Sequence, residues 1–261
     1  MGTYLDRILV AHRAAAAADH RDVDALLAEA HTVAAPRGFA RALTDAVVGN
    51  RLAVISEVKR RSPSKGDLFA GLDPAVLATQ YATGGAACLS VLTDENFFGG
   101  SADDLRAARG AVPLPVLRKD FTVCLADIAD AALMGADCVL LIAAALAADE
   151  LAQLHGAATS IGLDVLVEVH DEAELDIALG VGATLIGVNQ RDLVTFEVDH
   201  ARALRMGAAM PPDVVRVAES GIRGPDDAAA LRTAGYHAVL VGESLVTSGD
   251  PAAAVAALVH A

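Results

Sequence analysis

From residue 53 onward, short apolar runs alternate with longer amphipathic or alanine-rich segments. Eight of the runs have the length and the Val, Leu and Ile content of buried strands. These are residues 53–58, 88–92, 115–117, 138–142, 165–169, 185–188, 214–218 and 238–241. The segments expected as helices are residues 74–83, 102–109, 125–134, 147–160, 171–179, 200–206, 226–233 and 251–260. Regular alternation of strand and helix predicts parallel strands joined by right-handed crossovers.

Eight strand–helix units predict an α/β protein with a closed (β/α)8 TIM barrel, and the alternative is an open doubly wound sheet. Barrels of this kind have about 250 residues, and the chain has 261. Residues 1–50 lie outside the repeat, and their two short apolar stripes predict two helices that cap one end of the barrel. We therefore expect one domain over residues 1–261, with a helical extension at 1–50 and eight βα units at 51–261.

Composition and charge narrow the class of protein. Hydrophobic residues make up 54% of the chain and charged residues 21%, enough apolar material for a large core. The net charge of -14 argues against binding to nucleic acid, because such binding depends on cationic side chains. No run approaches the roughly 20 apolar residues that cross a membrane, and no signal peptide is evident. The three scattered cysteines are expected to be reduced. These features predict a cytoplasmic protein that binds neither nucleic acid nor membranes.

Charged and amide side chains recur at the carboxyl ends of the predicted strands, where barrel enzymes have their active sites. Residues two apart on a strand share a face, so Glu57 and Lys59 point the same way. Lys119, Glu168, Asn189 and Glu219 close four other strands. Buried charges are costly without partners, and a structural network of ion pairs would account for any one of them. Their convergence at one barrel mouth favours general acid–base chemistry.

The loops after the seventh and eighth strands resemble a phosphate site. Barrels commonly bind a substrate phosphate there through backbone N–H groups at glycines and at the start of a short helix. Ser220 and Gly221 follow the seventh strand, and Gly242, Glu243 and Ser244 follow the eighth. The Glu243 carboxylate would repel a phosphate, so this residue is expected to contribute only its backbone.

The sequence predicts neither a metal site nor a cofactor. Glu168 and His170 share one strand face, but no third ligand is evident, so His170 is interpreted as a solvated loop histidine. The chain has no GxGxxG or P-loop pattern, which leaves a nucleotide cofactor without support.

Several motifs together resemble the indole-3-glycerol phosphate synthase family. The most specific is the string Glu-x-Lys-x-x-Ser-Pro-Ser-Lys-Gly at residues 57–66. Similar runs occur, in the family's order, at residues 117–121, 167–169, 188–193 and 218–222, and at 92–94 followed by 97–100. One departure is Gln190, where Asn or Ser is more usual. The resemblance spans most of the chain and includes the N-terminal helices.

The resemblance implies a reaction and roles for the charged residues. The family closes the ring of 1-(2-carboxyphenylamino)-1-deoxyribulose 5-phosphate with loss of carbon dioxide and water, as a carboxy-lyase of tryptophan biosynthesis. Lys119 would be the general acid. Lys59 would pair with the substrate carboxylate or phosphate and assist loss of the hydroxyl. Glu57 and Glu168 would be the bases, and the sequence does not assign the steps between them.

The resemblance also implies substrate-binding residues. Glu219 and Asn189 would hold the ribulose hydroxyls and orient the lysines, and Arg191 would bind the anthranilate carboxylate. Phe97 or Phe98 would pack on the anthranilate ring, with ordinary loop packing as the alternative. The remaining contacts would come from Ser62 beside a lid at residues 64–66, from Ser220, and from Gly221, Gly242, Glu243, Ser244 and Lys59 around the phosphate.

Two rival functions remain. Phosphoribosylanthranilate isomerase is a phosphate-binding barrel of the same pathway, but it would need a Cys base at the end of the first strand, where Glu57 and Lys59 stand. A noncatalytic barrel would bind a sugar phosphate or a partner subunit without turnover. The expected partner is the phosphorylated anthranilate–ribulose adduct alone, with no cofactor and no metal, bound by a monomer or a weak homodimer.

Overall fold

The computed structural model describes residues 3–47, 49, 51–62, 66–69, 71–192 and 197–261. Eight parallel strands form a closed barrel in the order β1-β10-β9-β8-β7-β6-β5-β4, which confirms the TIM-barrel prediction and excludes the open sheet. The strands are β1 (Ala53–Val58), β4 (Cys88–Leu92), β5 (Val116–Lys119), β6 (Cys138–Ile142), β7 (Asp164–Val169), β8 (Leu185–Asn189), β9 (Val215–Glu219) and β10 (Ala238–Val241). Each lies within one or two residues of its predicted bounds.

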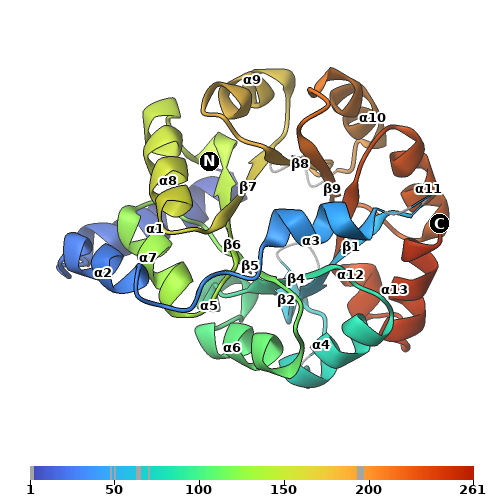
Figure 1. Ribbon diagram of the computed structural model, residues 1–261, viewed down its shortest axis with the longest axis horizontal. Coiled ribbons are helices and arrows are strands. Elements are labelled where there is room, and N and C mark those ends of the chain that lie inside the picture. Colours follow the sequence, from blue (N-terminus) through green and yellow to red (C-terminus); the bar gives the residue numbers. More distant parts are fainter. Residues whose placement is uncertain (1–2, 48, 50, 63–65, 70, 193–196) are drawn as a thin grey trace.

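A helix follows each strand, and the helices form a ring around the barrel (Figure 1). They are α4 (Pro74–Thr83), α6 (Ala102–Ala111), α7 (Leu125–Leu133), α8 (Ala148–Ser160), α9 (Glu172–Gly180), α10 (His200–Ala209), α11 (Pro225–Thr233) and α13 (Pro251–Val259). Local sequence defines several of their starts. The Asp73 carboxylate accepts N–H groups at the first turn of α4, and Pro74 occupies the first helical position, where no N–H is needed.

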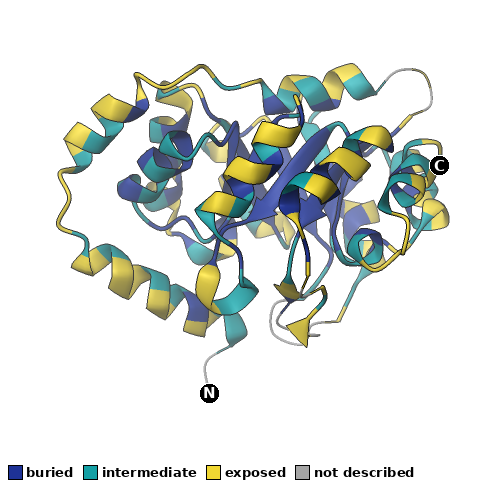
Figure 2. Cartoon of the chain, turned by 90° about the horizontal axis from the view of Figure 1, so that it is seen from below, coloured by how far each residue is buried: buried dark blue, intermediate teal, exposed yellow. Residues whose placement is uncertain are grey.

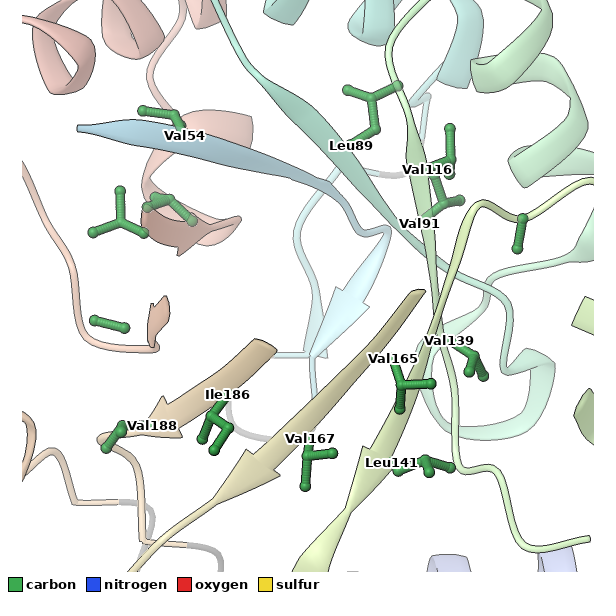
Figure 3. Close-up of a cluster of buried hydrophobic side chains, with 14 of the residues drawn as sticks. Val54, Leu89, Val91, Val116, Val139, Leu141, Val165, Val167, Ile186 and Val188 are labelled. Carbon is green, nitrogen blue, oxygen red and sulfur yellow. The ribbon is translucent and has the colours of Figure 1, made fainter. Parts of the chain in front are cut away.

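The core has two layers, because successive strand residues point to opposite faces. One face fills the barrel interior with side chains such as Ile55, Leu117, Leu140 and Leu166. The other packs against the helices, and its branched aliphatic side chains surround the barrel in Figure 3. Figure 2 shows the same division, with buried positions in the central strands and exposed positions on the outer helix faces.

The N-terminal segment has three helices, α1 (Tyr4–Ala18), α2 (Val23–Ala30) and α3 (Phe39–Ala46), where the sequence predicted two. They also do not share one end of the barrel. Phe39 and Leu43 of α3 are fully buried against the barrel interior at the amino ends of the strands. Tyr4 and Ile8 of α1 instead line the cavity at the carboxyl ends. The missed helix, α3, has only eight residues and begins at a glycine without a side-chain cap.

The loops at the carboxyl ends of the strands contain several short helices and strands. The loop after β1 contains the hairpin β2 (Arg61–Ser62) and β3 (Gly66–Asp67), and α5 (Glu95–Phe98) follows β4. The 3-10 turn η1 (Ala143–Ala145) follows β6, and α12 (Glu243–Val246) follows β10 as the short helix expected near a phosphate. Within the lid predicted at 64–66, Ser64 and Lys65 lie outside the described residues. No helix in the described ranges is long and apolar enough to cross a membrane.

Candidate active site

A cavity of about 620 Å³ opens at the carboxyl ends of the barrel strands. All but one of the residues predicted for the site line it: Glu57, Lys59, Ser62, Lys119, Glu168, Asn189, Arg191, Glu219, Ser220, Gly221, Gly242, Glu243 and Ser244. The exception is Phe97. Residues from the ends of six different strands and from the loops after them therefore meet at one mouth, as the strand alternation predicted.

Lys119 is the centre of the polar cluster. Its Nζ lies 2.8 Å from Glu168 Oε2 and 2.8 Å from Glu219 Oε2, so one ammonium group joins the ends of β5, β7 and β9. Burial lowers the pKa of Lys119, but the charges of Glu168, Glu219 and Glu57 outweigh burial and hold the pKa well above its ordinary value. The lysine is therefore protonated at neutral pH and has a proton to donate.

Two neighbouring carboxyls have opposite proton affinities. Burial raises the pKa of Glu168, but Lys119, His170 and Asn189 outweigh it and hold that pKa at about 2. Burial and the charge of Glu168 raise the pKa of Glu219 to about 7 against the pull of Lys119. The difference follows from the contacts, because Glu219 Oε1 has no hydrogen-bond partner among the described residues. Glu168 is thus an ionised base, and Glu219 carries a proton over part of the neutral range.

Glycines make room for two of the carboxylates. A Cβ on Gly187 of β8 would collide with Glu219 Oε1, and a Cβ on Gly242 would collide with Glu57 Oε1. Glu57 in turn forms an ion pair with Lys59, which is 17% exposed and faces the cavity. The chain has only three lysines. Two of them, Lys59 and Lys119, line this cavity, and the third lies outside the described residues.

Asn189 connects Glu168 to the next loop. Its Nδ2 donates to Glu168 Oε1 at 3.1 Å, and its Oδ1 accepts the Arg191 N–H at 3.0 Å. The asparagine therefore orients the carboxylate and also holds Arg191 at the cavity wall. Gln190, at the unusual position, bonds to the Ser220 carbonyl at 2.9 Å and to His200 Nδ1 at 3.0 Å, so it braces the predicted phosphate loop.

Backbone groups shape the side of the cavity where the sequence predicts a phosphate site. Ser220 and Gly221 have consecutive positive φ angles of 66° and 73°, so the backbone changes direction directly after β9 at the cavity wall. Gly242, Glu243 and Ser244 form the start of α12, where N–H groups have no partner inside the helix. Ser244 Oγ donates to the Ile222 carbonyl at 3.0 Å and so joins the two loops.

The opposite side of the cavity is apolar. Leu92, Phe98, Phe121, Leu140 and Ile142 line it from β4, β5, β6 and their loops. In the barrel order, β5 and β6 lie across from β9 and β10, which carry the predicted phosphate loops. The cavity thus has an apolar wall, a charged floor and a wall formed by the predicted phosphate loops, in that order across the mouth.

Phe97 and Phe98 were the two alternatives for contact with a substrate ring, and the geometry of the cavity favours Phe98. The Asp94 carboxylate accepts the N–H groups of both phenylalanines and fixes the short helix α5. That helix turns Phe97 toward Tyr4, with ring centroids 6.0 Å apart, and Phe98 toward Phe121, with centroids 6.1 Å apart. Only Phe98 lines the cavity.

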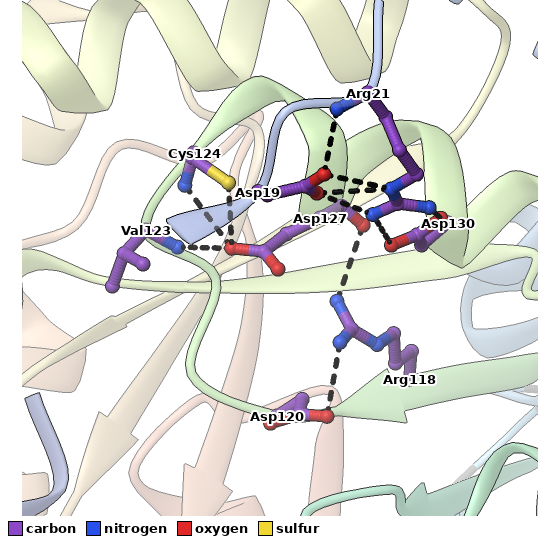
Figure 4. Close-up of polar contacts among 8 residues, drawn as sticks. All are labelled: Asp19, Arg21, Arg118, Asp120, Val123, Cys124, Asp127 and Asp130. Atoms are coloured by element: carbon purple, nitrogen blue, oxygen red, sulfur yellow. Dashed lines mark hydrogen bonds and ion pairs between the residues drawn. The ribbon is translucent and has the colours of Figure 1, made fainter. Parts of the chain in front are cut away.

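Helix α1 also belongs to the site, and no pattern in the sequence indicated this. His12 Nε2 lies 2.9 Å from Asp94 Oδ2 and 4.0 Å from Asp120 Oδ1, so α1 is bonded to the loops after β4 and β5. Figure 4 shows how Arg118 bonds Asp120 and the Asp127 carbonyl, and how Arg21 pairs with Asp19 and Asp130 beside α7. His12 and Asp94 are more than eighty positions apart in the chain, so no periodicity in the sequence predicts their contact.

His12, Asp94 and Asp120 are also the residues whose ligand atoms lie close enough together to hold a metal ion, within the described ranges. Protein groups already satisfy these atoms. Asp120 pairs with Arg118 at 3.0 Å, and Asp94 accepts two backbone N–H groups as well as His12. The cluster therefore functions as a connection between α1 and the barrel. That the protein needs no metal ion stays a prediction.

The interpretation of His170 as a solvated loop histidine is wrong. Its side chain is only 11% exposed, and its Nδ1 lies 3.1 Å from Glu174 Oε2. Its Nε2 lies 3.5 Å from Glu168 Oε1. The ring is buried because α9 begins two residues later and packs its first turn over the end of β7.

Comparison with known proteins agrees with the resemblance of the motifs. A family model described as indole-3-glycerol phosphate synthase matches residues 5–258. A protein of that name from Mycobacteroides abscessus is 49% identical over 263 residues, covering all of this chain and 95% of the relative. Another from a Nocardioides species is 55% identical over 202 residues, covering 77% of this chain and 78% of the relative.

Solved structures with low sequence identity share the fold. Tryptophan synthase subunit alpha from Legionella pneumophila superposes with a TM-score of 0.62 at 15% identity, covering 87% of this chain and 98% of that one. Thiamine phosphate pyrophosphorylase from Pyrococcus furiosus gives 0.58 at 16% identity, covering 80% and 94%.

Proposed function

This chain belongs to the indole-3-glycerol phosphate synthase family, and from that premise we propose how its cavity performs the reaction. The substrate is 1-(2-carboxyphenylamino)-1-deoxyribulose 5-phosphate, and the enzyme is a carboxy-lyase. The aromatic carbon that bears the carboxylate attacks the ribulose carbonyl. The new ring then loses carbon dioxide and water and becomes indole-3-glycerol phosphate. The observation that carries the proposal is the single ammonium group of Lys119 held between two carboxyls with different proton affinities.

The substrate has three chemically distinct parts, which match the apolar wall, the charged floor and the predicted phosphate loops of the cavity. The anthranilate ring packs against Phe98 and Phe121, and the phosphate binds at the start of α12 and at Gly221. The ribulose carbonyl then lies over the charged floor between them. Lys59 and Arg191 supply positive charge for the anthranilate carboxylate and the phosphate, which is needed in a chain with a net charge of -14.

Lys119 is the general acid of ring closure. A carbonyl oxygen gains negative charge as the aromatic carbon attacks, and a positioned ammonium group stabilises that charge and gives it a proton. The proton on Lys119 is secured before the reaction by Glu168 and Glu219, both at 2.8 Å. Loss of carbon dioxide then restores two electrons to the ring system without any cofactor.

The dehydration step needs an acid for the leaving hydroxyl and a base for the ring proton. Glu168 is ionised at neutral pH and is the base that the contacts favour. Lys59 pairs with Glu57, whose carboxylate lies beside Gly242 at the predicted phosphate loops, so we assign Lys59 as the acid. Glu219 lines the cavity and has a pKa raised to about 7, so its protonated carboxyl is assigned as a hydrogen-bond donor to a ribulose hydroxyl.

The experiment follows indole-3-glycerol phosphate by fluorescence and carbon dioxide by a coupled assay, in buffer without metal or nucleotide. One carbon dioxide per indole product supports the proposal. A folded protein that binds the substrate without releasing either product would contradict it and would favour the noncatalytic barrel. The same assay with phosphoribosylanthranilate tests the isomerase alternative, for which we expect no turnover.

A further inference from the structure

His170 stands directly behind the carboxylate that we assign as the base. It is two positions after Glu168 along the strand direction, so both side chains lie on the same side of the barrel end. Its Nε2 is 3.5 Å from Glu168 Oε1. That nitrogen is buried and has no hydrogen-bond partner among the described residues. A buried ring nitrogen aimed at an active carboxylate is not explained by packing alone.

The orientation of the ring is set by α9. Glu174 Oε2 accepts the His170 backbone N–H at 2.7 Å and lies 3.1 Å from Nδ1 of the same residue. The Glu174 N–H is in turn held by the helix cap Asp171 at 2.8 Å. A carboxylate at Nδ1 places a proton on that nitrogen, and therefore directs Nε2 toward Glu168. The side chains of Glu174, His170 and Glu168 are 18%, 11% and 4% exposed, a series that runs from the rim inward.

The charges around the ring favour its protonated form. Three carboxyls face it from three elements: Glu168 of β7, Glu174 of α9 and Glu219 of β9. Lys119 lies on the far side of Glu168. Burial lowers the pKa of His170, but the Glu174 hydrogen bond and the three carboxyls outweigh burial and raise it above its ordinary value. An imidazolium at this position presents an Nε2–H to Glu168 Oε1.

We propose that His170 is a positioning residue for the reaction, which holds Glu168 ionised and turns Glu168 Oε2 toward Lys119 and the substrate. Glu174 acts through His170 by fixing its ring. Glu168 thus has three contacts with separate tasks: Lys119 and His170 supply positive charge, and Asn189 fixes the carboxylate plane. This inference rests on the proposed function, because it gives His170 a task only if Glu168 is the base.

The kinetic test compares the pH profile of kcat for wild type, His170→Asn and Glu174→Gln. Asn is neutral at every pH, so Glu168 loses one positive neighbour and its pKa rises. We expect the acid limb of the profile to move upward by about one pH unit in His170→Asn and less in Glu174→Gln. KM should change little, because neither side chain lines the cavity. His155→Gln, a half-buried histidine of α8, is the matched control and should leave the profile unchanged.

A second readout does not depend on turnover. The pKa of the His170 ring is measured by NMR in wild type and in Glu168→Gln, with the signal assigned from His170→Asn. Because coupling between two titrating groups is reciprocal, loss of the Glu168 charge should lower the pKa of His170. An unmoved His170 pKa together with an unmoved acid limb would overturn the inference. Absence of turnover in wild type would instead overturn the proposed function, and the NMR shift would still be measurable.

Discussion

At the residue scale, the chemistry depends on how the protein distributes one positive charge among several carboxyls. Glu168 and Glu219 both contact Lys119 at 2.8 Å, but among the described residues only Glu168 accepts a further hydrogen bond, from Asn189. The other oxygen of Glu219, Oε1, is buried against Gly187 and has no hydrogen-bond partner among the described residues. Supporting hydrogen bonds therefore decide which carboxyl is ionised, and Glu219 is left as the carboxyl that holds a proton more readily.

The same asymmetry predicts opposite effects of pH on stability. The pKa of Glu219 is raised to about 7, above its unfolded value of about 4.3, so wild-type stability declines as pH rises through this window. The difference between the Tm of Glu219→Gln and the Tm of wild type should therefore shift in favour of Glu219→Gln as pH rises from 5 to 8. The pKa of Glu168 is lowered to about 2, so wild type should lose its advantage over Glu168→Gln as pH falls from about 4 toward 2. Parallel Tm curves for wild type and Glu219→Gln across neutral pH would count against the assignment.

At the scale of single elements, the short helix α5 decides which aromatic side chain reaches the substrate. Phe98→Ala should raise KM by roughly tenfold, because the ring of the substrate loses an aromatic contact that contributes about 1–2 kcal/mol. Phe97→Ala is the matched control from the adjacent position and should change KM far less, since Phe97 packs on Tyr4 outside the cavity. Steady-state KM for both variants makes the comparison. Equal effects would place both rings at the substrate.

Helix α1 is held over the mouth by the bond between His12 and Asp94, at 2.9 Å. His12→Ala should raise KM several-fold with little change in Tm, because α1 would no longer hold Tyr4 and Ile8 against the cavity. Burial lowers the pKa of His12, but its bond to Asp94 and the charge of Asp120 raise it overall. The bond is therefore complete at low pH and weakens as pH rises through that pKa. Val10→Ser, on the exposed side of the same helix, is the control.

The elements also show where sequence reasoning succeeds. Every strand of the barrel could be predicted, because buried parallel strands appear as short apolar runs between helical segments. The charged residues at the strand ends could be placed because side chains two positions apart share a face of a strand. Thirteen of the fourteen residues predicted for the site line the cavity. Contacts such as His12 with Asp94, or His170 with Glu174 at the start of a packed helix, depend on tertiary structure. So did the choice of Phe98 over Phe97, since α5 has only four residues and no readable repeat.

At the scale of the whole molecule, stability and chemistry are at opposite ends of the barrel. Helix α3 closes the amino end through Phe39 and Leu43. Buried Asp137 accepts the Arg37 N–H and the Val116 N–H, both at 2.8 Å, and so connects the approach to α3 with β5. The carboxyl end holds the charged cluster and the cavity. This division is the usual one for the fold.

Phe39→Ala tests that division. It should lower the free energy of unfolding by about 3–5 kcal/mol, because it leaves a cavity under the barrel, while kcat of the folded protein stays near that of wild type. Chemical denaturation gives the stability, and kcat is measured where the variant is fully folded. Phe39→Leu should lose less stability, and the exposed Arg41→Ala should lose almost none. A large loss of kcat in a stable Phe39 variant would show that the two ends are coupled.

The central claim is that Lys119 donates the proton of ring closure from between its two carboxyls. The most direct measurement is single-turnover formation of indole-3-glycerol phosphate by Lys119→Met, with substrate binding measured separately and Arg106→Met as the surface control. The account predicts a rate at least about 10² below that of wild type, with substrate still bound and the fold intact. A single-turnover rate close to that of wild type would contradict it, because the acid would then be another group.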